Sequence, residues 1–133
     1  MAIIPKSNFL LLLICFVATL FSIALATPGT AGFYGKEFYV PTVCYGSKPQ
    51  GNLIATSDHL GGEFNCGTLL KVTCIGKVPQ PCTGKSVVVK IVDNCPGCGT
   101  SEHVTMNLSE DAYRIIANPV VAQGHVSIDY VKV

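Results

Sequence analysis

Residues 86–117 read SVVVKIVDNCPGCGTSEHVTMNLSEDAYRIIA, and this stretch says most about the fold. Its first seven residues, Ser86–Val92, are rich in valine and isoleucine, which predicts a β-strand. An Asp-Asn-Cys-Pro turn should end that strand, and a short loop rich in cysteine and glycine should follow. The next residues, Met106-Asn107-Leu108-Ser109, then lead into a helix.

The helix has a start signal and an apolar stripe. Asn107 is the expected N-cap with Glu110 at the third helical position, which resembles a capping box, and Asp111 adds negative charge to the first turn. Asn118-Pro119 should end the helix. The apolar stripe consists of Ala112, Ile115 and Ile116.

Outward from this stretch, further segments read as strands. Thr30–Tyr34, Thr68–Cys74 and His125–Val133 have the composition or alternation of β-structure, and Ser57 or Asp58 could cap a short helical turn toward Leu60. The segment 76–84 holds two prolines and a cysteine, so we expect a tight excursion there. One short helix among several short strands suggests a small closed barrel.

The N-terminus has the pattern of a secretory leader. Lys6 is followed by an almost entirely apolar run to Leu25, and Ala24-Leu25-Ala26 is a small-x-small cleavage site. A membrane anchor is the competing interpretation, but the single lysine and the Ala-x-Ala ending favour a signal peptide over residues 1–26. We therefore expect a secreted, extracellular protein whose mature chain does not insert into a membrane.

Residues 27–133 should form one domain. Removal of the leader from the 133-residue chain leaves 107 residues, with eight basic and eight acidic side chains. This neutral balance without a basic patch argues against nucleic acid as a partner. We expect a monomer.

Cysteines indicate disulfides. The six that follow the leader form an even set in a small secreted domain, which predicts three bridges, and fifteen pairings are possible. Cys95-Pro96-Gly97-Cys98 superficially resembles a redox or zinc motif, but no second ligand pair accompanies it. The six residues are Cys44, Cys66, Cys74, Cys82, Cys95 and Cys98.

Catalytic chemistry finds little support in the residues. Hydrolysis of a glycan normally needs two carboxylates that flank the bond. Asp93, at the end of a buried strand, is the one acid that burial could tune, although an Asp before Asn-Cys-Pro also commonly holds a turn through an Asx bond, and that chemistry favours the structural interpretation. The acids after the leader are Glu37, Asp58, Glu63, Asp93, Glu102, Glu110, Asp111 and Asp129.

The residues also give no support for a nucleophilic site or a metal site. No Gly-x-Ser-x-Gly motif occurs, and His59, His103 and His125 lie in unrelated contexts, so we expect neither a nucleophilic site nor a metal or other cofactor. Asn107-Leu108-Ser109 is an N-glycosylation sequon, and Asn107 is therefore also a candidate glycosylation site.

Seven short motifs, taken together, resemble the plant natriuretic peptide-like proteins, which are also described as secreted proteins with a family-45 endoglucanase-like, or expansin-like, domain. Their order, spacing and cysteine placement carry the resemblance over nearly all of residues 29–133. The motifs are Gly29–Tyr34, Val43–Gly46, Ile54–Asp58, Asn65–Gly67, Val72–Cys74, Ile91–Pro96 and Asn107–Ser109.

This resemblance implies a mainly β fold, a six-stranded double-psi β-barrel with one or two short helices. It also implies the disulfides Cys44–Cys66 and Cys74–Cys82, which leaves Cys95 and Cys98 to pair. Expansins proper carry a second, cellulose-binding domain rich in exposed aromatics. This chain has no Trp and ends at Val133, so we expect that surface to be missing.

The resemblance also identifies a candidate groove made of Thr30, Tyr34, Asp93 and Asn107. Enzymatic relatives place one catalytic Asp near the first strand and another just before Leu-Ser. Here Gly35 and Lys36 follow Tyr34, and Asn107 holds the second position. An amide cannot protonate a leaving group as a carboxylic acid does, so we expect no catalytic residues.

Two functions follow as hypotheses. The first is a secreted, non-enzymatic protein of the apoplast that resembles plant natriuretic peptides, acts in water and solute homeostasis and stress response, and has a cell-surface receptor as its partner. The alternative is a module that binds cell-wall polysaccharide and has weak wall-loosening action.

Overall fold

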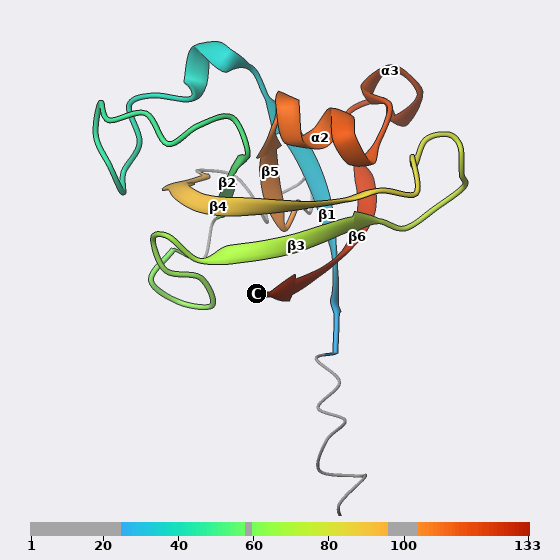
Figure 1. Ribbon diagram of the computed structural model, residues 1–133, viewed down its shortest axis with the longest axis horizontal. Helices are drawn as coiled ribbons and strands as arrows, with labels where there is room; N and C mark the ends of the chain where they lie inside the picture. Colours follow the sequence, from blue (N-terminus) through green and yellow to red (C-terminus); the bar gives the residue numbers. More distant parts are fainter. Residues whose placement is uncertain (1–24, 58–59, 96–103) are drawn as a thin grey trace, which may run out of the picture.

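The computed structural model describes residues 25–57, 60–95 and 104–133. It confirms the predicted fold class, because six strands close into one barrel in the order β1-β5-β2-β4-β3-β6 (Figure 1). The pairs β1–β5 and β2–β4 are parallel, and the other four neighbouring pairs are antiparallel. The strands are β1 (Thr27–Tyr34), β2 (Ile54–Ser57), β3 (Leu69–Cys74), β4 (Ser86–Asn94), β5 (Met106–Ser109) and β6 (Val126–Lys132).

Alternating side chains fill the barrel from the longer strands. In β3 the even-numbered residues are buried, in β4 the odd-numbered ones up to Ile91, and in β6 Val126, Ile128 and Tyr130. Composition predicted β3 and β4, and alternation predicted β6; the observed bounds of all three differ from the expected ones by no more than two residues. Each large apolar side chain that is fully buried stabilises the fold by roughly 1.5–3 kcal/mol.

Helix α2 (Glu110–Ile116) packs against the barrel, and its buried side chains are part of the barrel's hydrophobic core (Figure 1). Ala112, Tyr113 and Ile116 are buried, and the Tyr113 ring packs on Phe33 of β1 with a centroid distance of 4.8 Å. Ile115 packs partly buried against the same core, so the predicted apolar stripe is confirmed.

The predicted start of this helix is wrong. Asn107 lies in β5, and the N-cap is Ser109, whose Oγ accepts a hydrogen bond from the Ala112 N–H at 3.2 Å. The predicted stop is confirmed, because α2 ends at Ile116 with its C-cap at Ala117, directly before Asn118-Pro119. Asn118 then caps a second helix, α3 (Pro119–Ala122), where its side chain accepts from the N–H groups of Val120 and Val121.

Two further expectations need correction. Ser57 is the last residue of β2, and Leu60, where the helical turn was expected to lead, forms an isolated β-bridge with Phe64; Asp58 lies outside the described residues. β1 begins at Thr27, three residues before the expected start of the first strand. A short 3-10 helix, η1 (Lys36–Phe38), opens the 35–53 segment, which the sequence left unassigned.

The disulfides Cys44–Cys66 and Cys74–Cys82 are present as the resemblance implied, with Cα–Cα distances of 5.6 and 5.4 Å. Cys95 is also disulfide-bonded, but its expected partner Cys98 lies outside the described residues. The same is true of the expected leader up to residue 24. Within the described ranges, no helix has the length and apolar character that a membrane crossing requires.

Candidate functional site

One row of register partners crosses four neighbouring strands of the barrel. Gly32 on β1 pairs with Asn107 on β5, Asn107 pairs with Thr56 on β2, and Thr56 pairs with Asp93 on β4. Partners in adjacent strands share a face of the sheet, so these residues lie on the same side of the barrel wall.

The same row extends along β1. Ala31 and Phe33 belong to the core or pack against it, so Thr30, Gly32 and Tyr34 point to the opposite, outer side. All four residues of the predicted groove therefore lie on one outer face. We call this surface the candidate face, made of Thr30, Gly32, Tyr34, Thr56, Asp93 and Asn107.

A bulge aims Asp93 at this face. Ala55 pairs with Ile91 but the next residue, Thr56, pairs with Asp93, so β4 contains one extra residue, Val92. If Val92 took a normal strand position instead, Asp93 would follow Val89 and Ile91 into the core, because side chains alternate along a regular strand. The bulge leaves the carboxylate half-exposed on the outer side.

Asp93 fastens the end of β4 to the 35–53 segment. Its Oδ1 accepts hydrogen bonds from the Val43 N–H at 3.0 Å and from the Asn94 N–H at 2.8 Å. Asp93 therefore has the expected structural role at the Asn-Cys-Pro turn, through Asn94, and it also binds Val43, which lies fifty residues away.

Asn107 occupies the centre of the candidate face. Its side chain lies over Gly32, where a Cβ would collide with Asn107 Oδ1. Its Nδ2 donates to Cys95 Sγ at 3.0 Å. The amide is thus held by two neighbouring groups, in a strand and not at a helix cap.

Thr30 is tied to the residue that precedes β5. Its N–H donates to Thr105 Oγ1 at 3.0 Å, and the Thr105 N–H donates to both the carbonyl oxygen and the hydroxyl oxygen of Thr30. These bonds fix the side of the candidate face formed by β1 and β5.

Aromatic side chains border the face. Tyr34 meets Tyr39 edge to face, with ring centroids 5.5 Å apart, and Tyr34 also packs on buried Ile54 and Val92. Burial raises the pKa of the Tyr34 phenol, and nearby Tyr39 and Asp93 raise it further. Tyr34 therefore stays neutral, as a hydrogen-bonding group beside Asp93.

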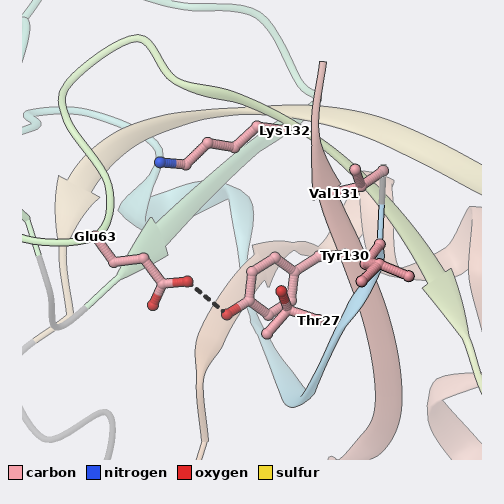
Figure 2. A pocket seen from close by; sticks show the side chains of 6 residues that line it. Thr27, Glu63, Tyr130, Val131 and Lys132 are labelled. Carbon is pink, nitrogen blue, oxygen red and sulfur yellow. Dashed lines mark hydrogen bonds between the residues drawn. The ribbon is translucent and has the colours of Figure 1, made fainter. Parts of the chain in front are cut away.

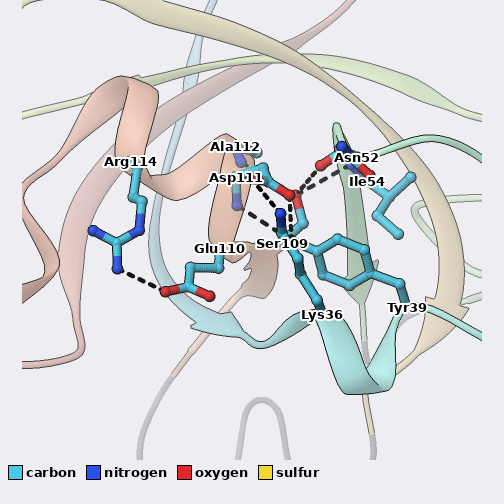
Figure 3. A network of polar contacts seen from close by, with 9 residues as sticks. All are labelled: Lys36, Tyr39, Asn52, Ile54, Ser109, Glu110, Asp111, Ala112 and Arg114. Atoms are coloured by element: carbon cyan, nitrogen blue, oxygen red, sulfur yellow. Dashed lines mark hydrogen bonds and ion pairs between the residues drawn. The ribbon is translucent and has the colours of Figure 1, made fainter.

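A polar network holds the 35–53 segment against the start of α2 (Figure 3). Ser109 Oγ donates to the Asn52 carbonyl at 2.6 Å while it caps the helix. Tyr39 donates to Asp111 Oδ2 at 3.0 Å and accepts from the Asp111 N–H, and Lys36 lies 3.7 Å from the same carboxylate. The network fixes the tyrosines that border the candidate face.

The sequence did not predict Thr56 as a site residue, because a single threonine in the segment Ile-Ala-Thr-Ser belongs to no catalytic or binding motif. It is 7% exposed, and its hydroxyl has no hydrogen-bond partner, although it lies between Asn107 and Asp93. A buried hydroxyl without a partner typically costs about 1–3 kcal/mol.

Most other described acids have structural partners. Glu110 binds Arg114 at 2.7 Å, and Glu63 accepts from the Tyr130 hydroxyl at 2.9 Å. Asp58 and Glu102 lie outside the described residues. Among the residues that the structure does describe, no three of His, Cys, Asp and Glu come together as metal ligands would.

Two surface cavities, each of about 310 Å³, lie away from the candidate face. Figure 2 shows the first, where Thr27, Glu63, Tyr130 and Lys132 meet. Burial, together with the hydrogen bond to Glu63 and its charge, raises the pKa of Tyr130 to about 12. Leu25 also lines this cavity and belongs to the expected leader.

Comparison with known proteins gives one consistent picture. A double-psi β-barrel family model described as lytic transglycolase matches residues 57–130. An EG45-like domain containing protein of Arabidopsis thaliana is 48% identical over 117 residues, covering 84% of this chain and 87% of the relative. Another from Citrus jambhiri is 39% identical over 124 residues, covering 88% and 87%. Expansin-B4 of Arabidopsis thaliana is 37% identical over 112 residues, which cover 74% of this chain but only 42% of the expansin.

Proposed function

Because the chain belongs to the EG45-like family of double-psi β-barrel proteins, to which the plant natriuretic peptide-like proteins belong, we propose that it is a secreted, non-enzymatic protein of the apoplast. Its role is in water and solute homeostasis and in the response to stress. A cell-surface receptor is its partner, and the mature chain, residues 27–133, acts as a monomer.

The observation that carries the non-enzymatic proposal is the amide of Asn107 at the centre of the candidate face. Hydrolysis of a glycosidic bond calls for a proton donor and a second carboxylate, separated by roughly 5–9.5 Å across the bond. Asn107 cannot supply the proton, and Oδ1 of Asp93 already accepts two backbone N–H groups. The family model is described as lytic transglycolase, so the non-enzymatic proposal depends on the amide at position 107 and not on the family match.

The homeostasis role can be tested on leaf protoplasts. Secreted protein purified from culture medium is added at increasing concentration, and protoplast volume is recorded. We expect swelling with the wild-type protein and less swelling with Tyr34→Ala. A Lys48→Ala variant controls for non-specific loss, because Lys48 is exposed and outside the candidate face. Absence of swelling at any concentration would refute the signalling role.

A second candidate function is the binding of cell-wall polysaccharide, with weak wall-loosening action. It is favoured by Tyr34, a partly exposed ring held edge to face by Tyr39, which lies on the same face as the polar side chains of Asn107 and Asp93. Aromatic faces and a few polar groups are the usual elements of a small-ligand site.

Pull-down on cellulose, xylan and chitin separates the two candidates. A protein that acts only through a receptor stays in the supernatant, whereas a polysaccharide-binding module sediments. If it sediments, Tyr34→Phe keeps the ring and removes only the hydroxyl, so its comparison with Tyr34→Ala shows which part of the side chain the glycan contacts.

A further inference from the structure

The second of the two surface cavities lies where the 76–84 segment meets the junction of α2 and α3. Gln80 and Thr83 line it from the segment, and Arg114 and Asn118 line it from the helices. We propose that this cavity binds a uronate, the carboxylate-bearing sugar unit of an acidic polysaccharide. The proposal rests on the proposed extracellular location but not on the role of the candidate face.

The cavity is preformed. The Asn118 N–H donates to the Pro81 carbonyl at 2.8 Å, and the Thr83 N–H donates to the Ile116 carbonyl at 2.9 Å. Thr83 Oγ1 also donates to the Ile115 carbonyl at 2.6 Å. The disulfide at Cys82 anchors the same segment to β3, so little order has to be created when a ligand binds.

The lining offers donors more than acceptors. Asn118 Oδ1 already accepts from the N–H groups of Val120 and Val121, so its amide presents NH₂. Thr83 adds neither a free donor nor a strong acceptor, because its hydroxyl donates to the Ile115 carbonyl and its oxygen accepts from the Lys85 N–H. Arg114 adds a guanidinium, whose planar fork matches a carboxylate with two parallel hydrogen bonds.

Glu110 already accepts one hydrogen bond from that guanidinium, but the other N–H groups of the guanidinium are not engaged by Glu110. Glu110 Oε1 accepts from Nη2 of Arg114 at 2.7 Å, one turn away on the same helix (Figure 3). The Arg114 side chain is 56% exposed, and exposed pairs of this spacing contribute little to stability. A ligand carboxylate can therefore replace Glu110, or share the guanidinium with it.

The remaining lining favours a sugar over an acidic peptide. Pro79 and Pro119 provide apolar contact for the C–H groups of a sugar ring, and Gln80 can both donate to and accept from sugar hydroxyls. A volume of about 310 Å³ is at the small end for ligand pockets, which run from roughly 300 to 1,000 Å³.

A peptide would need free backbone partners, and several main-chain groups around the cavity are already engaged. Proline has no N–H, and the carbonyls of Pro81, Ile115 and Ile116 already accept hydrogen bonds within the protein. Pairing with an extended peptide depends on such free main-chain groups.

The proposal can be tested by NMR titration of the secreted protein with trigalacturonate, and with galactotriose as the neutral match. We expect trigalacturonate to shift the amide signals of Thr83, Ala117 and Asn118, and galactotriose to shift them far less. Arg114→Gln should weaken trigalacturonate binding by about tenfold or more, because a hydrogen-bonded ion pair is lost. Glu110→Gln should strengthen it, because the competing carboxylate is removed.

Two variants control for overall charge. Lys48→Gln removes one positive charge, as Arg114→Gln does. Glu37→Gln removes one negative charge, as Glu110→Gln does. Neither Lys48 nor Glu37 lines the cavity. Both should bind as the wild-type protein does. Absence of shifts with trigalacturonate, equal shifts with galactotriose, or undiminished binding by Arg114→Gln would overturn the proposal.

An acidic peptide, acetyl-Asp-Asp-Asp-amide, provides the remaining arm. Tighter binding of this peptide than of trigalacturonate at the same amides would refute the choice of a sugar. The protoplast and cellulose assays, repeated with Arg114→Gln, keep the two proposals apart: that variant should behave there as wild type, whatever the outcome of the titration.

Discussion

The side-chain amide of Asn107 lies directly over Gly32, its register partner on the neighbouring strand β1. Any side chain at position 32 would have to displace Asn107 Oδ1, and with it the contact between Nδ2 and Cys95 Sγ. The absence of a Cβ on β1 thus allows the amide to lie flat against the barrel wall at the centre of the candidate face.

A double-mutant cycle tests this relationship. Gly32→Ala should destabilise the protein by roughly 1–3 kcal/mol in urea unfolding, because the new methyl group overpacks the site. The same change in an Asn107→Ala background should cost clearly less, since the clashing atom is gone. Equal costs in the two backgrounds would show that Asn107 does not depend on Gly32.

The capping of α2 makes a second prediction. Ser109→Ala removes the cap to Ala112 and the hydrogen bond to the Asn52 carbonyl, and should cost roughly 1–3 kcal/mol. Asn107→Ala removes no capping bond and should cost less. Chemical denaturation measures the free energy of unfolding of both variants. A larger loss for Asn107→Ala than for Ser109→Ala would show that Asn107 is the N-cap.

Alkaline pH should reveal the contact between Tyr130 and Glu63. The pKa of Tyr130 is raised to about 12, above the value of about 10 for a free tyrosine, so the folded state favours the neutral phenol. Its contribution to stability is complete below about pH 10 and is lost as the pH rises toward 12.

Glu63→Gln should lower the pKa of Tyr130, because the variant removes the negative charge of Glu63, which raises this pKa, and leaves only a weaker, neutral acceptor for the phenol hydrogen bond. Tyrosine ¹³Cζ shifts, followed by NMR through the titration, measure the change. Tyr34 is the internal control, since its raised pKa comes from burial, Tyr39 and Asp93. An unchanged Tyr130 titration would show that Glu63 does not act on it.

The sequon at Asn107 should carry no glycan in protein that is expressed through the secretory pathway and has folded. Its Nδ2 is the atom to which a glycan would be attached, and this atom donates to Cys95 Sγ in a strand flanked by β1 and β2. Intact-mass spectrometry should give the mass of the unmodified mature chain. A mass that falls after amidase treatment would contradict this expectation.

The parts of the fold that could be predicted are those with a local pattern. β3, β4 and β6 alternate between buried and exposed residues, and valine and isoleucine are frequent in them. β2 and β5 have only four residues each, nearly all buried, so they show no alternation. Their strand character comes from partners far along the chain, which no local rule detects.

The error at Asn107 has a similar cause. Asn107 and Ser109 are both good caps, and only the pairing of β5 with β1 and β2 decides that the helix starts after Ser109. The outward aim of Asp93 likewise depends on a bulge, and the residues Ile-Val-Asp-Asn give no sign of it. The resemblance to a known family identified the four groove residues, whereas only the strand register shows that they lie on one face of the barrel.

The central claim, that the candidate face has no hydrolytic chemistry, is tested most directly by a sensitive assay of new reducing ends. Purified wild-type protein is incubated with soluble β-glucan, xylan and chitin oligomers beside Asp93→Asn and a heat-inactivated sample. We predict that all three samples match the buffer blank on every substrate. Release of reducing ends by the wild-type protein that disappears in Asp93→Asn would contradict the claim, because it would show that this face catalyses hydrolysis with Asn107 in place.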